Sequence, residues 1–152
     1  MKIAIGADHG GFSHKEAIKK HLIERGFEVK DFGANDDTST DYNDYALLVS
    51  ESVRDHMFDR GILICGTGIG MSIMANKVEG IRAALVHDLF TAEATRQHNN
   101  TNVLAMGGRI IDVEKAIKIV DIWLDTKFSN EERHVRRVNK IDSYKGEWVW
   151  EN

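Results

Sequence analysis

The chain has 152 residues, of which 42% are hydrophobic and 29% charged, and this suits one globular domain with a sizeable core. Its net charge of -4 argues against general nucleic-acid binding, and no stretch approaches the roughly 20 apolar residues of a membrane span. The N-terminus lacks the features of a signal peptide, and the single cysteine, Cys65, excludes an internal disulfide, so we expect a cytoplasmic protein.

The N-terminal part predicts a strand, a helix and a second strand. The apolar run 2–6 is typical of a strand. Ser13-x-x-Glu16 then matches a capping box, and Gly26 follows the apolar positions as a stop signal, so a helix is expected between them. The run 27–33 alternates between apolar and polar residues, which favours a strand at the edge of a sheet.

The middle of the chain repeats this order. Apolar residues at helical spacing from Tyr45 to Met57 predict a helix. The continuously apolar run 62–65 is typical of a strand that is buried on both faces. A glycine-rich turn follows it, and a helix is expected over about 69–78.

The last third contains two more strands and three helices. The runs 81–86 and 102–106 predict strands. Asp88 is expected to cap a helix that runs toward His98, and Asp112 one that continues to about residue 124. Ser129-x-x-Glu132 is a second capping box, and the helix it opens has an apolar side formed by Val135, Val138 and Ile141.

Five strands, each followed by a helix, indicate a parallel sheet with helices on both faces. We therefore predict a single domain, residues 1–152, with a three-layer α/β/α Rossmann-like fold, a five-stranded parallel sheet and a C-terminal helix. The tail, about 144–152, belongs to no motif. Its alternating Trp148 and Trp150 either pack on a partner subunit or form a loose end.

Most of the candidate reactive groups follow strands, and ligands of open parallel sheets bind beyond the carboxyl ends of the strands. We therefore expect these groups at one edge of the sheet. They lie in the segments Asp8-His9-Gly10-Gly11, Cys65-Gly66-Thr67-Gly68-Ile69-Gly70, His87-Asp88 and Gly107-Gly108-Arg109.

The turn Gly66-x-Gly68-x-Gly70 fits neither of two familiar phosphate motifs. A dinucleotide fingerprint would need glycine at position 71, which is Met71, and no Gly-Lys-Ser/Thr follows as a P-loop requires. A glycine turn that leads into a helix still leaves backbone N–H groups free beside the positive end of the helix dipole. The turn is thus either an anion site or a tight connection without a ligand.

Cys65 borders this turn. A thiol beside a helix N-terminus ionises more readily, and a thiolate acts as a nucleophile or as a base. The neighbouring N–H groups would also stabilise negative charge that forms on a substrate oxygen. The alternative for a lone cysteine is an inert, buried small side chain.

Basic residues form a second group of candidates. Arg133 and Arg137 lie one helical turn apart, and they either grip a phosphate together or belong to a solvated basic face. His98 ends a helix, where the dipole favours its protonated form, although a histidine there is often only a cap. The remaining helical histidines, His14, His21 and His56, are interpreted as structural.

Four segments together resemble one family over essentially the whole chain. They are GADHGGF (6–12), ILICGTGIGMSIMANK (62–77), RQHNNTNVLAMGGR (96–109) and RHVRR (133–137). In order and spacing they resemble type B ribose-5-phosphate isomerase, a family that also contains galactose- and allose-6-phosphate isomerases. The resemblance implies aldose–ketose isomerisation in pentose phosphate and carbohydrate metabolism, without metal or organic cofactor.

The resemblance also implies roles for individual residues. Cys65 would be the base, and His98 would open the furanose ring. The enediolate would be held by the Thr67 hydroxyl and by the backbone amides of Gly66, Thr67, Gly68, Ile69 and Gly70. The substrate-binding residues would be Asp8 and Asn99 at the sugar and His9, Arg109, Arg133 and Arg137 at the phosphate. Members are dimers or tetramers with shared sites, so His98 and Asn99 would reach the Cys65 of another subunit.

The chain departs from the family at Asp41-Tyr42-Asn43, where Asp-Tyr-Pro is usual. A less rigid loop is expected, because proline would fix one backbone dihedral, and Tyr42 is left out of the site. Two alternatives to ribose 5-phosphate isomerisation stay open. One is isomerisation of a six-carbon phosphosugar, and the other is a phosphosugar-binding module without activity.

Overall fold

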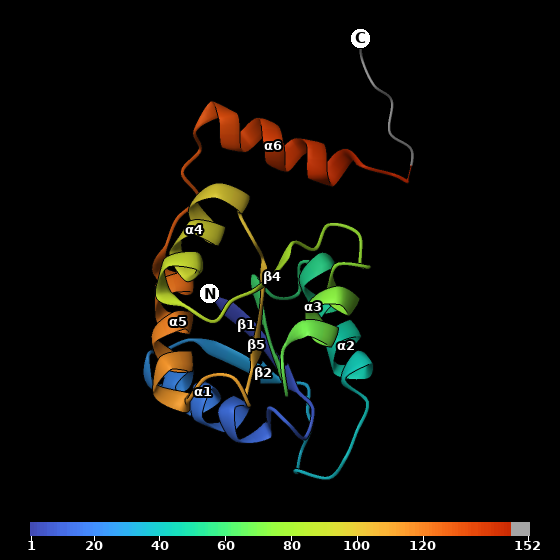
Figure 1. Ribbon diagram of the computed structural model, residues 1–152, viewed down its shortest axis with the longest axis vertical. Coiled ribbons are helices and arrows are strands. Elements are labelled where there is room, and N and C mark those ends of the chain that lie inside the picture. Colours follow the sequence, from blue (N-terminus) through green and yellow to red (C-terminus); the bar gives the residue numbers. More distant parts are fainter. Residues whose placement is uncertain (147–152) are drawn as a thin grey trace.

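Five parallel strands form the central sheet of the computed structural model, which describes residues 1–146 (Figure 1). The strand order is β2-β1-β3-β5-β4, so β2 is an edge strand, as its alternating sequence predicted. The strands are β1 (Lys2–Ala7), β2 (Glu28–Asp31), β3 (Arg60–Cys65), β4 (Ala83–Leu85) and β5 (Val103–Gly107).

Helices cover both faces of this sheet, which confirms the three-layer α/β/α prediction. They are α1 (Phe12–Glu24), α2 (Tyr42–Arg54), α3 (Ile69–Ala75), α4 (Leu89–Asn99), α5 (Val113–Asp125) and α6 (Glu132–Ser143). Within residues 1–146, no helix has the length and apolar character needed to cross a bilayer. Trp148 and Trp150 of the predicted tail lie outside the described residues.

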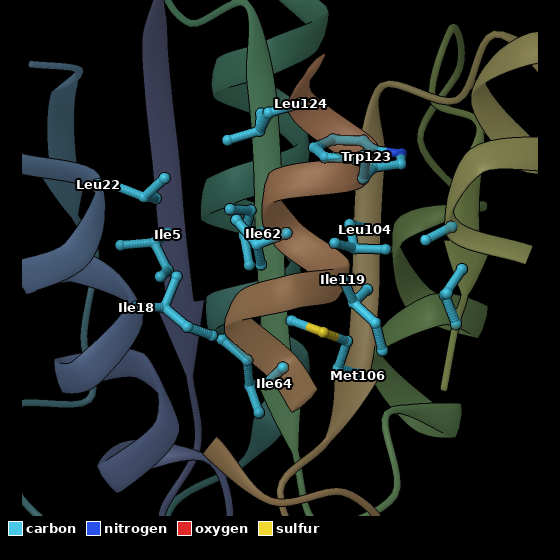
Figure 2. Close-up of a cluster of buried hydrophobic side chains, with 14 of the residues drawn as sticks. Ile5, Ile18, Leu22, Ile62, Ile64, Leu104, Met106, Ile119, Trp123 and Leu124 are labelled. Carbon is cyan, nitrogen blue, oxygen red and sulfur yellow. The ribbon is translucent and has the colours of Figure 1, made fainter. Parts of the chain in front are cut away.

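Two hydrophobic clusters hold the layers together. One lies between the sheet and α1, α4 and α5, and it includes Ile62, Ile64 and the fully buried Trp123 (Figure 2). The other lies between the sheet and α2 and α3, and it includes Leu63 and Cys65. Successive residues of β3 thus enter opposite clusters, which explains why this strand is apolar throughout.

The strand order reverses between β1 and β3, because β2 lies on one side of β1 and all later strands lie on the other. Helix α1, which follows β1, packs in one cluster, and α3, which follows β3, packs in the other. The connections therefore diverge at the carboxyl ends of β1 and β3, where open sheets of this kind form their ligand crevice.

Two of the four predicted helix caps are confirmed. The side chains of Asp88 and Asp112 accept N–H groups from Thr91 at 2.7 Å and from Lys115 at 2.8 Å. The prediction that Ser13 caps α1 is wrong. The cap is Gly11, two residues earlier, and its close contact with the Ile64 carbonyl leaves no room for a side chain.

The prediction that Ser129 caps α6 is also wrong, because the cap residue is Glu131. The Ser129 hydroxyl instead lies 2.6 Å from Nδ1 of His134 and accepts the N–H of Glu131 at 3.2 Å. On the predicted apolar side of α6, Val138 is buried but Ile141 is 54% exposed. Helix α6 therefore presents a partly unburied apolar side.

Other boundaries differ by a few residues. Helix α2 begins at Tyr42, so Asn43 belongs to its first turn rather than to a loop, and it ends before His56, which has a φ of 57°. Helix α3 ends at Ala75 instead of about 78, because the Asn76 side chain bonds both backbone groups of Ala83 at 2.9 and 3.0 Å and fixes a turn.

Candidate active site

The glycine turn after β3 surrounds the sulfur of Cys65. The Cys65 side chain is only 4% exposed, and its Sγ accepts the N–H of Gly68 at 3.0 Å. Gly68 has a φ of 77°, in the left-handed region that favours glycine, and this conformation turns its N–H toward the sulfur. The amide dipole lies where it stabilises negative charge on Sγ.

Other amides of the turn have no acceptor. Among residues 1–146, the N–H groups of Gly66, Thr67 and Gly70 take part in no hydrogen bond within the chain, whereas Ile69 donates to the Thr67 hydroxyl at 3.3 Å. Helix α3 has only seven residues, so these individual amides, rather than a long helix dipole, are the donors for an anion.

The segment after β5 packs directly on this turn. Gly108 donates its N–H to the Cys65 carbonyl at 2.8 Å, and Arg109 donates to the Gly66 carbonyl at 3.0 Å. A Cβ atom on Gly66 would lie 3.1 Å from Nη1 of Arg109. The Arg109 guanidinium therefore lies beside the free amides, where it adds a positive charge to the donor set.

The segment after β1 forms the other side of the crevice. Asp8 is 6% exposed, and its Oδ1 accepts the N–H of Gly10 at 2.8 Å. A Cβ atom on Gly10 would lie 2.9 Å from the nitrogen of Gly66, so both glycines permit the close approach of the two segments. His9 lies next to Asp8 and accepts the Thr40 N–H on Nδ1 at 3.3 Å.

Two residues without a predicted role lie in the same region. The ring of Tyr42, which is not among the predicted site residues, lies against the turn, since a Cβ atom on Gly70 would be 2.5 Å from its Cζ. His87 accepts the N–H of Gly107 on Nε2 at 2.9 Å. Burial lowers the pKa of His87, and Lys115 lowers it further, so the neutral acceptor form is favoured.

The remaining candidate residues lie at the opposite, amino end of the sheet. Helix α4 starts at the carboxyl end of β4 and runs back along the sheet, so its last residues, His98 and Asn99, lie close to Asn102. The backbone of Asn102 accepts the N–H of Gly61 in β3 and donates to the carbonyl of Arg82, which comes just before β4. Helix α6 crosses this end of the molecule next to α4 (Figure 1) and carries Arg133 and Arg137, both exposed. Within one chain, the residues of the expected site therefore form two groups at opposite ends of the sheet.

Several large apolar side chains lie exposed along the edge of the sheet where Cys65 is found. They come from the carboxyl edge of the sheet and from the helix starts beside it, and they are Ile69 (50% exposed), Leu85 (40%), Leu89 (42%), Phe90 (75%) and Ile110 (56%). A cluster of large exposed apolar side chains beside a polar crevice is typical of a surface that another molecule covers.

Comparison with known proteins identifies close relatives over nearly the full length. The family model described as Ribose/Galactose Isomerase matches residues 3–141. Ribose-5-phosphate isomerase B of Escherichia coli is 49% identical over 140 residues, which are 92% of this chain and 93% of that protein. D-erythrulose-4-phosphate isomerase 2 of Mycolicibacterium smegmatis is 40% identical over 149 residues, 96% of this chain and 98% of that protein.

Solved structures agree with these matches. Ribose-5-phosphate isomerase B of Clostridium thermocellum superimposes with a TM-score of 0.92 at 49% identity, over 93% of this chain and 95% of that one. The enzyme of Mycoplasma genitalium with bound ribulose-5-phosphate gives a TM-score of 0.89 at 45% identity, over 93% of both chains.

Proposed function

As a member of the ribose/galactose isomerase family, this chain is an aldose–ketose sugar-phosphate isomerase, and we propose that it interconverts ribose 5-phosphate and ribulose 5-phosphate through an enediolate. The observation that carries the proposal is the position of the Cys65 sulfur. It lies at the switch point of the sheet, 3.0 Å from the Gly68 nitrogen and beside amides that have no acceptor in the described chain.

The proton transfer follows from this arrangement. With the open-chain aldose in the crevice, the Cys65 thiolate takes the proton from C2, and the C–H electrons form a C1–C2 double bond while O1 becomes an oxyanion. The free N–H groups of Gly66, Thr67 and Gly70 and the Thr67 hydroxyl then hold the enediolate oxygens. Return of the proton to C1, with transfer of the O2 proton to O1, then gives the ketose with its carbonyl at C2 and a hydroxyl at C1. A positioned base contributes typically about 10²–10⁴-fold to such a step.

Asp8 and Asn99 would contact the sugar hydroxyls, and His9, Arg109, Arg133 and Arg137 would hold the phosphate. His98 would donate the proton that opens the furanose ring. Binding of the phosphate, which does not react, would supply energy that orients the reacting carbons against the sulfur.

The separation of the two residue groups supports a shared site in a homodimer or homotetramer. His98, Asn99, Arg133 and Arg137 lie at the other end of the sheet from Cys65, so a second copy of the chain would supply them. The apolar cluster of Ile69, Leu85, Leu89, Phe90 and Ile110 beside the crevice offers a surface for that copy to cover. The free thiol of Cys65 fits a reducing, cytoplasmic setting.

Mixing two inactive variants tests the shared site. Cys65→Ala and His98→Asn chains, each carrying a different affinity tag, are co-expressed and the whole population is assayed. In a dimer with shared sites, half of the dimers are mixed and each holds one intact site, so about a quarter of the wild-type activity returns. If each site lies within one chain, mixing restores nothing.

A coupled assay with the pure protein tests the substrate. We expect the highest kcat/KM for ribose 5-phosphate, measured against allose 6-phosphate, galactose 6-phosphate and D-erythrulose 4-phosphate, the last because of the M. smegmatis relative. A higher value for a six-carbon sugar would replace the proposed substrate. Binding of ribose 5-phosphate without conversion of any sugar would instead indicate a binding module.

A further inference from the structure

Two histidine rings meet where α4 and α6 touch. His98 lies in the last turn of α4 and His134 in the first turn of α6, with ring centroids 4.5 Å apart and planes tilted by 39°. His98 is exposed, whereas His134 is only 4% exposed. The proposed ring-opening residue therefore has one face against a buried aromatic side chain.

The buried ring is fixed at its far side. Nδ1 of His134 lies 2.6 Å from the Ser129 hydroxyl, which also accepts the N–H of Glu131 at 3.2 Å. The Ser129 N–H donates in turn to the carbonyl of Gln97 at 3.1 Å, one residue before His98. The last turn of α4 is thus held twice: His98 contacts the ring of His134, and Gln97 accepts a hydrogen bond from Ser129, the partner of that ring.

The charges around His134 favour its neutral form. Burial lowers the pKa of His134, and the neighbouring His98, Arg133 and Arg137 lower it further, while only Glu131 opposes them. Two stacked imidazoles repel each other when both are charged. His134 therefore places a neutral ring against His98.

We propose that His134, held by Ser129, is a positioning residue that orients the His98 imidazole for opening the sugar ring. The inference rests on the proposed function, because ring opening has meaning only for a cyclic sugar phosphate. His134 lies between Arg133 and Val135 on the helix that also carries Arg137, so the ring contact fixes His98 relative to both arginines. The arginines that would hold the phosphate and the imidazole that would donate the ring-opening proton then keep a fixed position relative to each other.

The test separates ring opening from proton transfer. Ribulose 5-phosphate has its O5 blocked by phosphate and is open-chain, so exchange of its C1 hydrogen with deuterium in D₂O needs the Cys65 base but no ring chemistry. We compare this exchange, followed by NMR, with the kcat for ribose 5-phosphate in His134→Asn and His134→Phe. Asparagine keeps a partner for Ser129 and removes the ring, and phenylalanine keeps a ring against His98.

In His134→Asn we expect kcat for ribose 5-phosphate to fall about tenfold or more, the size of effect that misplacement of a reacting group produces, while deuterium exchange is unchanged. His134→Phe should recover most of the loss. Val138→Ala is the control, because Val138 is buried under α6 but is not part of the histidine pair. It should show no selective loss of ribose 5-phosphate turnover.

Equal losses of turnover and exchange in His134→Asn would overturn the proposal, as would wild-type turnover in that variant. A selective loss in Val138→Ala matching that of His134→Asn would also overturn it, since general displacement of α6 would then be sufficient. A wild-type protein inactive on both sugars would instead refute the proposed function, so the two failures are distinguishable.

Discussion

Replacement of Gly68 by alanine probes the turn that holds Cys65. Gly68 has a φ of 77°, and an L-residue in this left-handed conformation costs about 1–2 kcal/mol. Its Cβ atom would also lie 2.6 Å from Cδ1 of Leu85 and 2.7 Å from the carbonyl carbon of Met106, a backbone atom that cannot rotate away. Overpacking of this kind adds about 1–3 kcal/mol.

We therefore expect Gly68→Ala to lose about 2–5 kcal/mol of unfolding free energy, the sum of the two effects. For a chain of this size, each kcal/mol lowers Tm by about 2–4 °C. Activity should fall as well, because the clash moves the N–H that Gly68 donates to the Cys65 sulfur. Turnover of ribose 5-phosphate is measured well below the variant's Tm, so that unfolding does not contribute.

Gly80→Ala is the matched control. Gly80 has nearly the same φ, 79°, but no atom lies within 4 Å of the Cβ position. It should pay only the conformational cost, about 1–2 kcal/mol, and keep full activity. If Gly68→Ala is as stable as Gly80→Ala and retains wild-type turnover, then the turn is not packed as described and the Gly68 amide does not support the sulfur.

Two further predictions concern groups near the sheet. The folded-state pKa of His87 lies below its ordinary 6.5, so the unfolded chain takes up its proton first as the pH falls. The free energy of unfolding should therefore drop as the pH falls through about 6.5. His87→Gln should weaken this pH dependence, measured by urea unfolding at several pH values, and an unchanged dependence would contradict the lowered pKa of His87. Trp123 is fully buried and donates to Oγ1 of Thr101 at 2.9 Å, so Trp123→Phe should lose about 1–3 kcal/mol in urea unfolding. A double-mutant cycle with Thr101→Val should show coupling, and purely additive losses would exclude a contribution from this bond.

Local patterns predicted most of the fold, since four of the five strands have an apolar run and β2 has an alternating one. The two aspartate caps, Asp88 and Asp112, were also predictable because each accepts an N–H only three residues further along the chain. The two capping boxes failed for different reasons. Close packing of Gly11 on the Ile64 carbonyl, a contact between distant parts of the chain, sets the start of α1. The hydroxyl of Ser129 is engaged by His134, which is near in sequence but is not a residue that the capping-box pattern considers.

The candidate site was predictable where it follows the strands. Cys65, Asp8 and Arg109 were expected at one edge of a parallel sheet, and their segments do pack together there. The contact of Tyr42 with Gly70 was missed because it joins the first turns of α2 and α3, whose packing against each other no local pattern reveals. The stacking of His134 on His98 was missed for a similar reason, since the angle between α4 and α6 depends on packing rather than on either helix alone.

The base role of Cys65 is tested most directly by Cys65→Ser, which keeps the shape of the side chain but replaces the thiol by a hydroxyl that barely ionises. We expect deuterium exchange at C1 of ribulose 5-phosphate to fall at least about 10²-fold, while the sugar phosphate binds with wild-type affinity. Wild-type exchange in Cys65→Ser would show that another group removes the proton, and the proposed mechanism would then be wrong.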